Sequence, residues 1–315
     1  MSQYTIQSLS DYIRAVCELD YYLVRNGAEL NEKLLFRGQS DKSYELLPSI
    51  GRNRKHTTQI SIFNEERNLI DMAKFKLPDI FNDSLQPIEL LALLQHYGIP
   101  TRLLDITENA LVALYFACTG SRDSDGEVIA FKNNEDYVTN YPVINAIADS
   151  YRFTLGTSSD LSTFYRDVIE QDYFLEQRRM LKAIHKSDAE GGRWIARICE
   201  KPLIIYAPVR GTRQRIQSGR YILFPNDIDT YELDDSEKVF IWKITPLPKT
   251  HECVAGSIII PHNKKKEILK QLTLCGISEA ALFEDNTDIV CKGIKETFER
   301  KIKGEYFFDR DILMR

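Results

Sequence analysis

The sequence predicts an α+β protein in which helices flank a mixed, largely antiparallel sheet. Apolar residues with helical spacing dominate the first part of the chain, and short β-type runs follow in the second part. There is little of the regular strand–helix alternation that a doubly wound parallel sheet requires. No internal repeat, low-complexity tract or Gly/Ser-rich linker marks a domain boundary, so one integrated unit is expected.

The helices are predicted first, around one early strand. The apolar run Leu34–Phe36 predicts that strand. Helical spacing is found at residues 8–26, at residues 57–75, in PIELLALLQHYG and in TENALVALYFACTG. The last of these is apolar over most of its circumference and should be buried. Thr107 or Asp105 is expected to cap it.

The later strands are predicted by short runs of β-branched and aromatic residues. These runs are residues 127–131, 202–208, 220–225, 239–244 and 257–261. A helical stretch rich in exposed charge, 160–200, separates the first two. The chain is predicted to close with a helix at 263–274, a strand or turn at ISEAALF and a helix at 286–302.

Composition excludes several classes of protein. The chain has 315 residues, is 43% hydrophobic and carries 41 Lys and Arg against 46 Asp and Glu, a formal net charge of −5. Such a balance gives no global attraction for nucleic acid, so a polyanion would have to be bound locally. No apolar run is long enough to span a bilayer and no secretory leader is seen, so a cytoplasmic protein with no membrane partner is expected. Six scattered cysteines without a CxxC pair indicate reduced thiols, mostly core filler, and no zinc site.

Three segments could carry chemistry. The first is Phe36-Arg37-Gly38-Gln39, where a strand ends on a guanidinium next to a residue without a side chain. Such an end can hold a phosphate or a carboxylate. It is also an ordinary way for a chain to leave a sheet.

The second segment, QHYGIPTRLLDITENALVALYFA, is the densest cluster of reactive side chains. They are His96, Tyr97, Thr101, Arg102, Asp105 and Thr107. Helix ends and the loops between them allow such side chains to converge on a ligand. The structural alternative is that Asp105 and Thr107 cap a helix while Arg102 bridges Asp105 or a helix C-terminus.

The third segment, RGTRQRIQSGRYILF, is rich in arginine. It contains Arg210, Arg213, Arg215 and Arg220, together with Gln217 and Gly219. Neighbouring guanidinium groups repel one another unless an anion lies among them, so they could line a cleft for one. The alternative is a solvated basic loop paired with Asp227, Asp229 or Glu232.

Several common mechanisms are excluded by missing motifs. Neither a dinucleotide-binding GxGxxG nor a phosphate-binding GxxxxGK[ST] is present. There is also no GxSxG nucleophile elbow and no HExxH zinc motif. The five histidines are too dispersed to indicate a metal site.

Together the three segments resemble the signatures of the FRG-domain family. Phe36-Arg37-Gly38-Gln39, QHYGIPTRLLDIT and RQRIQSGRYILF match in order, and the segment that begins IIIPHNKKKEILKQLTLCGISEAALF is similar to the family's C-terminal end. The resemblance covers about residues 30–300. It implies an N-terminal helix at 1–30, an FRG domain at 31–302 and a tail at 303–315.

The order of the three segments also resembles that of ADP-ribosyltransferases, which implies a split sheet, NAD as substrate and no metal. By this resemblance Arg37 holds the pyrophosphate or ribose, Thr107 or Asp105 takes the middle role, and Gln217 stands where those enzymes have glutamate. Cleavage of the glycosidic bond develops positive charge on the ribose, which a carboxylate stabilises better than an amide. Asp105 is the preferred acid, ahead of Glu108 and Glu127.

The resemblance therefore implies a complete set of site residues. Catalytic roles fall to Arg37, His96, Asp105 and Gln217, with His96 as general base or ribose contact. NAD contacts are implied for Phe36, Arg37, Gly38, Gln39, Tyr97, Thr101, Arg102, Thr107 and Gly219. Contacts to the acceptor are implied for Arg210, Arg213 and Arg215.

The biological setting implied by the family is a bacterial toxin or phage-defence effector. The acceptor would be a nucleic acid or a protein, and an antitoxin or chaperone is a possible partner. Two rival hypotheses stay open. One is a non-catalytic module that binds a nucleotide or RNA, and the other is a nuclease-like or other hydrolase, which the lack of a carboxylate cluster disfavours.

Overall fold

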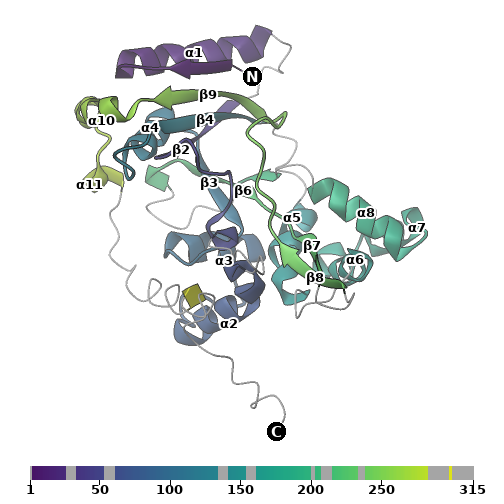
Figure 1. The fold of residues 1–315 in the computed structure, drawn as a ribbon. Helices are drawn as coiled ribbons and strands as arrows, with labels where there is room; N and C mark the ends of the chain where they lie inside the picture. Colours follow the sequence, from purple (N-terminus) through teal and green to yellow (C-terminus); the bar gives the residue numbers. More distant parts are fainter. Residues whose placement is uncertain are drawn as a thin grey trace.

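The centre of the molecule is a single seven-stranded sheet (Figure 1). The computed structural model describes residues 2–25, 33–52, 61–133, 141–153, 161–199, 203–206, 215–232, 238–282 and 298–299. The strand order of the seven-stranded sheet is β1-β9-β4-β2-β3-β6-β5. These strands are β1 (Ser2–Thr5), β2 (Lys33–Gln39), β3 (Leu103–Thr107), β4 (Gly126–Asn133), β5 (Leu203–Ile205), β6 (Gly219–Leu223) and β9 (Val254–Ile260). Within this sheet β1 and β9 are parallel and the other neighbours antiparallel, which confirms the predicted α+β class.

Helices cover both faces of the sheet. The described helices are α1 (Leu9–Arg25), α2 (Glu66–Lys76), α3 (Pro87–His96), α4 (Ala110–Cys118), α5 (Tyr141–Ala148), α6 (Leu161–Ile169), α7 (Arg178–Ile184), α8 (Asp188–Cys199), α10 (Lys265–Leu274) and α11 (Glu279–Leu282). Of these, α6, α7 and α8 form a group to one side of the sheet, where α6 packs on α8 (Figure 1). On β2, Leu34 and Phe36 join the core under α1, α4 and α10, whereas Leu35 joins the core with α2, α3 and α5. This follows from the period-2 alternation of a strand that is buried on both faces.

The two halves of the sheet are joined at one position. β2 pairs with β4 along its whole length, and β3 pairs with β6 along its whole length. Between β2 and β3, however, only Phe36 and Thr107 are paired. The end of β2 therefore diverges from β3, and the sheet is split at its centre.

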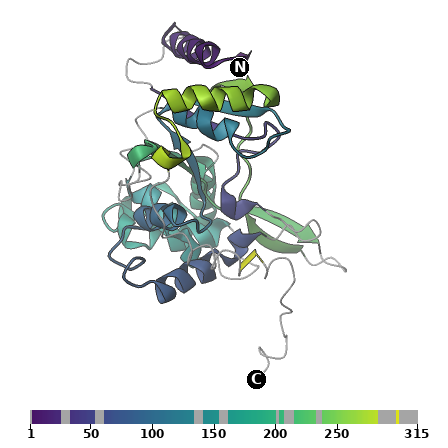
Figure 2. The same ribbon diagram turned by 90° about the vertical axis from the view of Figure 1, so that its left-hand side faces the viewer.

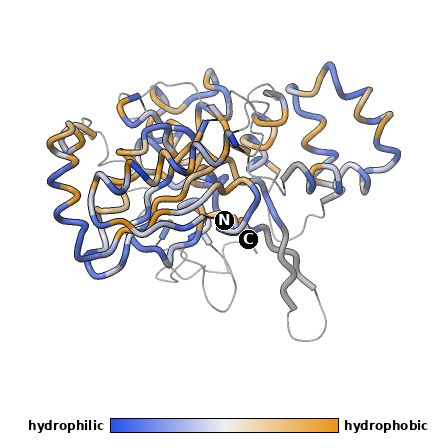
Figure 3. The backbone as a smooth tube through the Cα atoms, turned by 90° about the horizontal axis from the view of Figure 1, so that it is seen from above, coloured by the Kyte–Doolittle hydropathy of each residue, from blue (hydrophilic) through white to orange (hydrophobic). Residues whose placement is uncertain are grey.

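A separate hairpin lies outside the main sheet. Its strands are β7 (Asp227–Glu232) and β8 (Lys238–Lys243). Figure 2 shows this hairpin projecting from one side of the molecule. Figure 3 shows that hydrophobic segments gather toward the middle of the molecule and hydrophilic ones along its edges. None of the helices in the described parts of the chain is both long enough and apolar enough to cross a membrane.

The N-terminal segment is integrated into the sheet. β1 forms its edge, and α1 packs across it. Tyr12 on α1 donates to the carbonyl of Ala110 at 2.7 Å, and Gln271 on α10 accepts from the N–H of Leu9 at 2.9 Å. The tail predicted at 303–315 lies outside the described residues.

Most predicted elements are confirmed, and three predictions are wrong. LLDIT, expected as loop and helix start, is strand β3. α4 consequently begins later, and Asn109, not Thr107 or Asp105, caps it by accepting from the N–H groups of Leu111 and Val112. The described part of ISEAALF contains helix α11 where a strand or turn was predicted. The helix predicted at 286–302 lies almost wholly outside the described residues.

Candidate functional site

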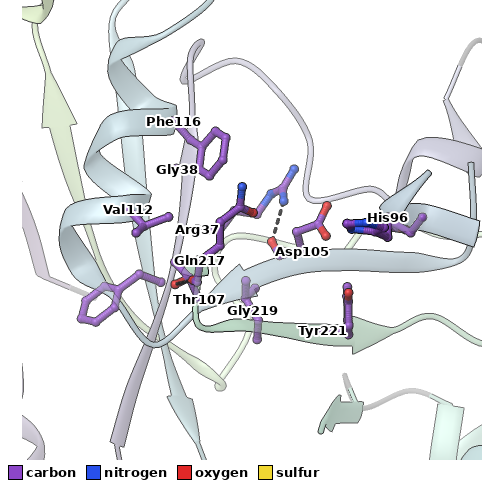
Figure 4. Close-up of a pocket in the computed structure, with 13 residues that line it drawn as sticks. Arg37, Gly38, His96, Asp105, Thr107, Val112, Phe116, Gln217, Gly219 and Tyr221 are labelled. Carbon is purple, nitrogen blue, oxygen red and sulfur yellow. Dashed lines mark hydrogen bonds between the residues drawn. The ribbon is translucent and has the colours of Figure 1, made fainter. Parts of the chain in front are cut away.

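A pocket of about 230 Å³ lies where β2 and β3 diverge (Figure 4). It is lined by Phe36, Arg37, Gly38, Gln95, His96, Asp105, Ile106, Thr107, Val112, Phe116, Gln217, Gly219 and Tyr221. Arg37 and Asp105 lie near its middle, Phe116 and Val112 toward one end, and His96 toward the other. The fold therefore brings parts of all three predicted segments into one cavity.

Arg37 is the cation of this pocket. Its Nη1 donates to the backbone carbonyl of Asp105 at 2.6 Å, while its buried Nε has no hydrogen-bond partner. Burial lowers the pKa of Arg37 to about 10, against a raising effect of the Asp105 carboxylate and with a further lowering by Arg52. The group is still charged at neutral pH. A partly buried cation with an unmade hydrogen bond at its buried Nε favours an anionic ligand.

Asp105 is the one carboxylate among the described residues that line the pocket. It is the exposed residue of β3 and lies opposite Tyr221 of β6 in the register. Arg52 is close enough for the Asp105 charge to raise its pKa, although burial lowers that pKa overall. The Arg52 side chain is fixed because its Nε and Nη2 donate to the carbonyl of Leu47 at 3.0 and 2.9 Å. The carboxylate is thus close to two guanidinium groups.

Thr107 and Gln217 hold the third segment against β3. The hydroxyl of Thr107 donates to the backbone carbonyl of Gln217 at 2.6 Å and accepts from the N–H of Asn109 at 2.9 Å. The Gln217 amide donates to the carbonyl of Leu282 on α11 at 3.0 Å. Next to it, Ser218 has a φ of 47°, a conformation that non-glycine residues seldom adopt. The backbone at this edge of the pocket is therefore closely constrained.

Glycine is needed at position 38 because α4 packs directly against the backbone of β2 there. A Cβ at this position would lie 1.8 Å from the carbonyl oxygen of Ala113 on α4. Only glycine lets α4 approach β2 so closely. This approach brings Val112 and Phe116 of α4 to the pocket.

His96 ends α3 and lines the pocket, in edge-to-face contact with the ring of Tyr97, 5.0 Å between centroids. Tyr97 itself does not line the pocket and packs edge-on against Phe81 at 5.8 Å. Gln39 is also outside it, buried and donating to the carbonyl of Glu45 at 3.2 Å. Thr101 is buried behind the pocket and hydrogen-bonded to Gln95.

Arg102 lies in the core, away from the pocket. It is 0% exposed and forms an ion pair with the buried Glu66. Its Nη1 also donates to Ser150 Oγ at 2.9 Å and to Asn226 Oδ1 at 2.5 Å. The guanidinium therefore joins α2 to the start of β3. It does not bridge Asp105, but its Nη1 donates to the carbonyl of Ile147 in the last turn of α5 at 3.3 Å, so the alternative of a contact to a helix C-terminus is confirmed. The implied contact to a cofactor has no support from this position.

The other candidate acids are engaged elsewhere. Glu108 accepts from Arg220 at 2.7 Å, and Glu127 pairs with Lys249 at 2.5 Å. Neither carboxylate lines the pocket. The Arg220 guanidinium also stacks on Tyr206, 3.9 Å from the ring centroid. Asp105 is left as the acid that the pocket can use.

The arginine-rich loop is described only in part. Arg215 is exposed and does not line the pocket. Arg210 and Arg213 lie outside the described residues. Gly219, also implied as a contact, does line the pocket.

Sequence reasoning missed five lining residues. They are Gln95, Ile106, Val112, Phe116 and Tyr221. Two signals could have found some of them: Gln95 directly precedes His96, and Val112 and Phe116 are four residues apart on a helix and so share a face. Within the described residues, no group of His, Cys, Asp and Glu side chains could hold a metal ion.

Comparison with known families gives one match. The FRG domain matches residues 32–126, which include β2, β3, α4 and the start of β4. The first two predicted segments lie within this match, whereas Gln217 lies beyond it. No curated protein and no solved structure matches the chain.

Proposed function

We propose that this chain, whose residues 32–126 match the FRG domain, is an NAD-dependent ADP-ribosyltransferase or a closely allied NAD-consuming hydrolase. One observation carries the proposal. Arg37, Asp105 and Gln217, from three distant segments, line a single pocket at the split of the sheet. This is the arrangement that the ADP-ribosyltransferase resemblance implies.

The chemistry assigns a role to each side of the pocket. Arg37, charged and with an unused donor, would bind the diphosphate of NAD. The Asp105 carboxylate would stabilise the positive ribose as the bond to nicotinamide breaks, and the electrons of that bond leave with neutral nicotinamide. The apolar side chains of Phe116 and Val112 would exclude water from the uncharged ring.

The reaction is completed by an acceptor nucleophile. A hydroxyl, amine or water attacks the anomeric carbon, and His96 would take the released proton. The acceptor would be a nucleic acid or a protein, with a role in a bacterial toxin or phage-defence system. An antitoxin or chaperone would fit such a system. The setting rests on the resemblance alone.

One observation favours the rival function, a non-catalytic nucleotide-binding module. Gln217 stands where the resemblance implies an acid, and its amide is engaged by the carbonyl of Leu282. A pocket with one carboxylate beside two guanidinium groups can bind a nucleotide without cleaving it. Binding and turnover must therefore be measured separately.

The experiment compares Asp105→Asn with Glu108→Gln. Purified protein is incubated with NAD labelled in the adenylate part, alone and with RNA, DNA or protein acceptors. Asp105→Asn should lower NAD consumption about 100-fold, as loss of an electrostatic stabiliser does. Glu108→Gln, which changes a nearby carboxylate outside the pocket, should keep at least about a third of the activity because no transition-state contact is lost.

The outcomes separate the two functions. No NAD loss and no label transfer in any mixture rejects the enzyme. Tight NAD binding that Arg37→Ala abolishes, without product, establishes the binding module. Circular dichroism spectra of all variants ensure that losses do not come from unfolding.

A further inference from the structure

Thr101 lies next to Gln95, which lines the pocket, and orients its side-chain amide. Its side chain is buried, 1% exposed. Its hydroxyl oxygen accepts from the backbone N–H of Leu103 at 3.2 Å, and its hydroxyl is hydrogen-bonded to Oε1 of Gln95. A threonine hydroxyl has one hydrogen to donate, and a buried donor requires an acceptor. The Gln95 carbonyl oxygen supplies that acceptor.

This contact decides which way the Gln95 amide faces. If the amide were reversed, its NH₂ group would face the Thr101 hydroxyl and the hydroxyl hydrogen would lose its acceptor. The carbonyl end of the amide is therefore held by Thr101, and the NH₂ end is left for other groups. Among the described residues no acceptor is found for this NH₂, and Gln95 lines the pocket. Gln95 thus offers the pocket a hydrogen-bond donor.

The donor is held rigidly. The backbone carbonyl of Gln95 accepts from the N–H of Gly98 at 2.9 Å, and Gly98, with a φ of 81°, ends the helix there. Both the main chain and the side chain of Gln95 are fixed without a ligand. A donor fixed in this way loses little entropy on binding.

The Asp105 carboxylate limits which chemical groups of a ligand can bind beside Gln95. Asp105 lines the same pocket, and its carboxylate accepts hydrogen bonds, whereas the Gln95 amide donates. The diphosphate of a dinucleotide is fully ionised, so it has no hydrogen to give a carboxylate and would be repelled by it. A hydroxyl group can donate to one and accept from the other. The pair therefore fits a sugar hydroxyl, and the phosphate belongs with Arg37.

We propose that Gln95 and Asp105 together bind a ribose hydroxyl of the nucleotide, with Thr101 as the positioning residue. The inference rests on the proposed function in that NAD supplies this ribose. It adds Gln95, which the sequence did not single out. It also changes the role of Thr101 from the implied contact with NAD to a residue that acts from behind the pocket without touching the ligand.

The test uses two nearly isosteric variants and a rescue. Thr101→Val removes the hydroxyl and frees the Gln95 amide to rotate, so ADP-ribose should bind about 3- to 10-fold more weakly, the worth of one hydrogen bond. Thr101→Ser restores the hydroxyl and should bind within about 2-fold of the native protein. Gln95→Glu still accepts from Thr101 but replaces the donor by a second carboxylate, so binding should fall more than about 10-fold. Gln177→Glu, outside the pocket, adds the same charge and is the matched control.

Inorganic pyrophosphate separates orientation from general damage. It has no sugar hydroxyl, so its affinity, measured by calorimetry, should be unchanged in Thr101→Val and lost in Arg37→Ala. With NAD, Thr101→Val should raise KM more than it lowers kcat. These readouts would not follow if Thr101 only supported the fold.

The outcomes distinguish the proposed ribose contact from the proposed ADP-ribosyltransferase activity. ADP-ribose binding that follows the predicted order, with no NAD consumed, supports the ribose contact and rejects the enzyme. NAD consumption with native ADP-ribose affinity in both Thr101→Val and Gln95→Glu supports the enzyme and overturns the contact. Equal loss of ADP-ribose and pyrophosphate in Thr101→Val also overturns it, and a native protein that binds neither probe overturns both proposals.

Discussion

Two arginines in the sequence motifs have opposite roles. Arg37 lines the pocket with an unused donor, whereas Arg102 is enclosed in the core with an acceptor for each side of its guanidinium. The sequence predicted Arg37 from its place at a strand end. It could not separate Arg102 from a ligand contact, because the partner Glu66 is far away in the sequence and only tertiary packing brings the two together.

Removal of Arg102 should destabilise the fold. Arg102→Met leaves the Glu66 carboxylate buried without a partner, which costs about 3–5 kcal/mol of unfolding free energy. The double variant with Glu66→Leu removes both charges and should regain most of that loss. Urea denaturation followed by circular dichroism gives the values.

Arg67→Met is the control for this pair. Arg67 faces Asp71 at 3.7 Å and donates to the carbonyl of Arg152 at 3.3 Å, and both side chains are partly exposed, so its loss should change stability by about 1 kcal/mol or less. A cost for Arg102→Met as small as that of Arg67→Met would contradict the assigned role of the buried pair.

At the scale of elements, the strand that carries the site was the hardest to predict. LLDIT is only five residues long, and Asp105 interrupts its apolar pattern. Its strand conformation depends on β2 and β6, which lie far away in the sequence. The strands at 220–225 and 257–261 were predictable because their β-branched and aromatic residues form continuous runs. The shifted start of α4 follows from the same error, since a residue within β3 cannot cap the helix.

The contact between α4 and β2 should depend on Gly38. Gly38→Ala places a methyl group 1.8 Å from the Ala113 carbonyl, so α4 must move or β2 must bend. We expect a loss of more than about 3 kcal/mol of unfolding free energy, above the usual cost of overpacking, because a backbone atom cannot rotate away. Denaturant titration gives this loss directly.

Gly98→Ala is the matched glycine variant. Gly98 has a φ of 81°, but nothing lies within 4 Å of a Cβ there, so only backbone strain of about 1–2 kcal/mol applies. A loss for Gly38→Ala no larger than that for Gly98→Ala would mean that α4 or β2 moves aside at little cost, which contradicts the assigned role of Gly38.

At the scale of the whole molecule, the reactivity of the cysteines distinguishes thiols that are packed in the core from thiols at the surface. The sequence predicted that most are core filler, and this is wrong for Cys17 and Cys275, which are exposed. Cys118 is buried and Cys253 partly so, and burial raises the pKa of each to about 12. Because the thiolate is the reactive form, iodoacetamide at about pH 8 should modify Cys17 and Cys275 and spare Cys118 and Cys253.

Peptide mass spectrometry of the native and urea-unfolded protein measures this difference. In urea all four thiols should react alike, since their surroundings are then equivalent. Native-state labelling of Cys118 as fast as that of Cys17 would show that α4 does not stay packed on the sheet.

The split of the sheet gives the last prediction. A ligand that fills the pocket contacts β2 on one side and β3 and β6 on the other, although Phe36 and Thr107 alone pair these two halves. Binding should therefore couple the halves. Saturating ADP-ribose should slow amide exchange at the C-terminal end of β2 and in β3 together, and ligand at 100 times Kd should add about 2.7 kcal/mol to the unfolding free energy. Hydrogen exchange with mass spectrometry measures both strands in one experiment. The Arg37→Ala variant should show neither effect, and slowing confined to β3 would mean that the ligand does not bridge the split.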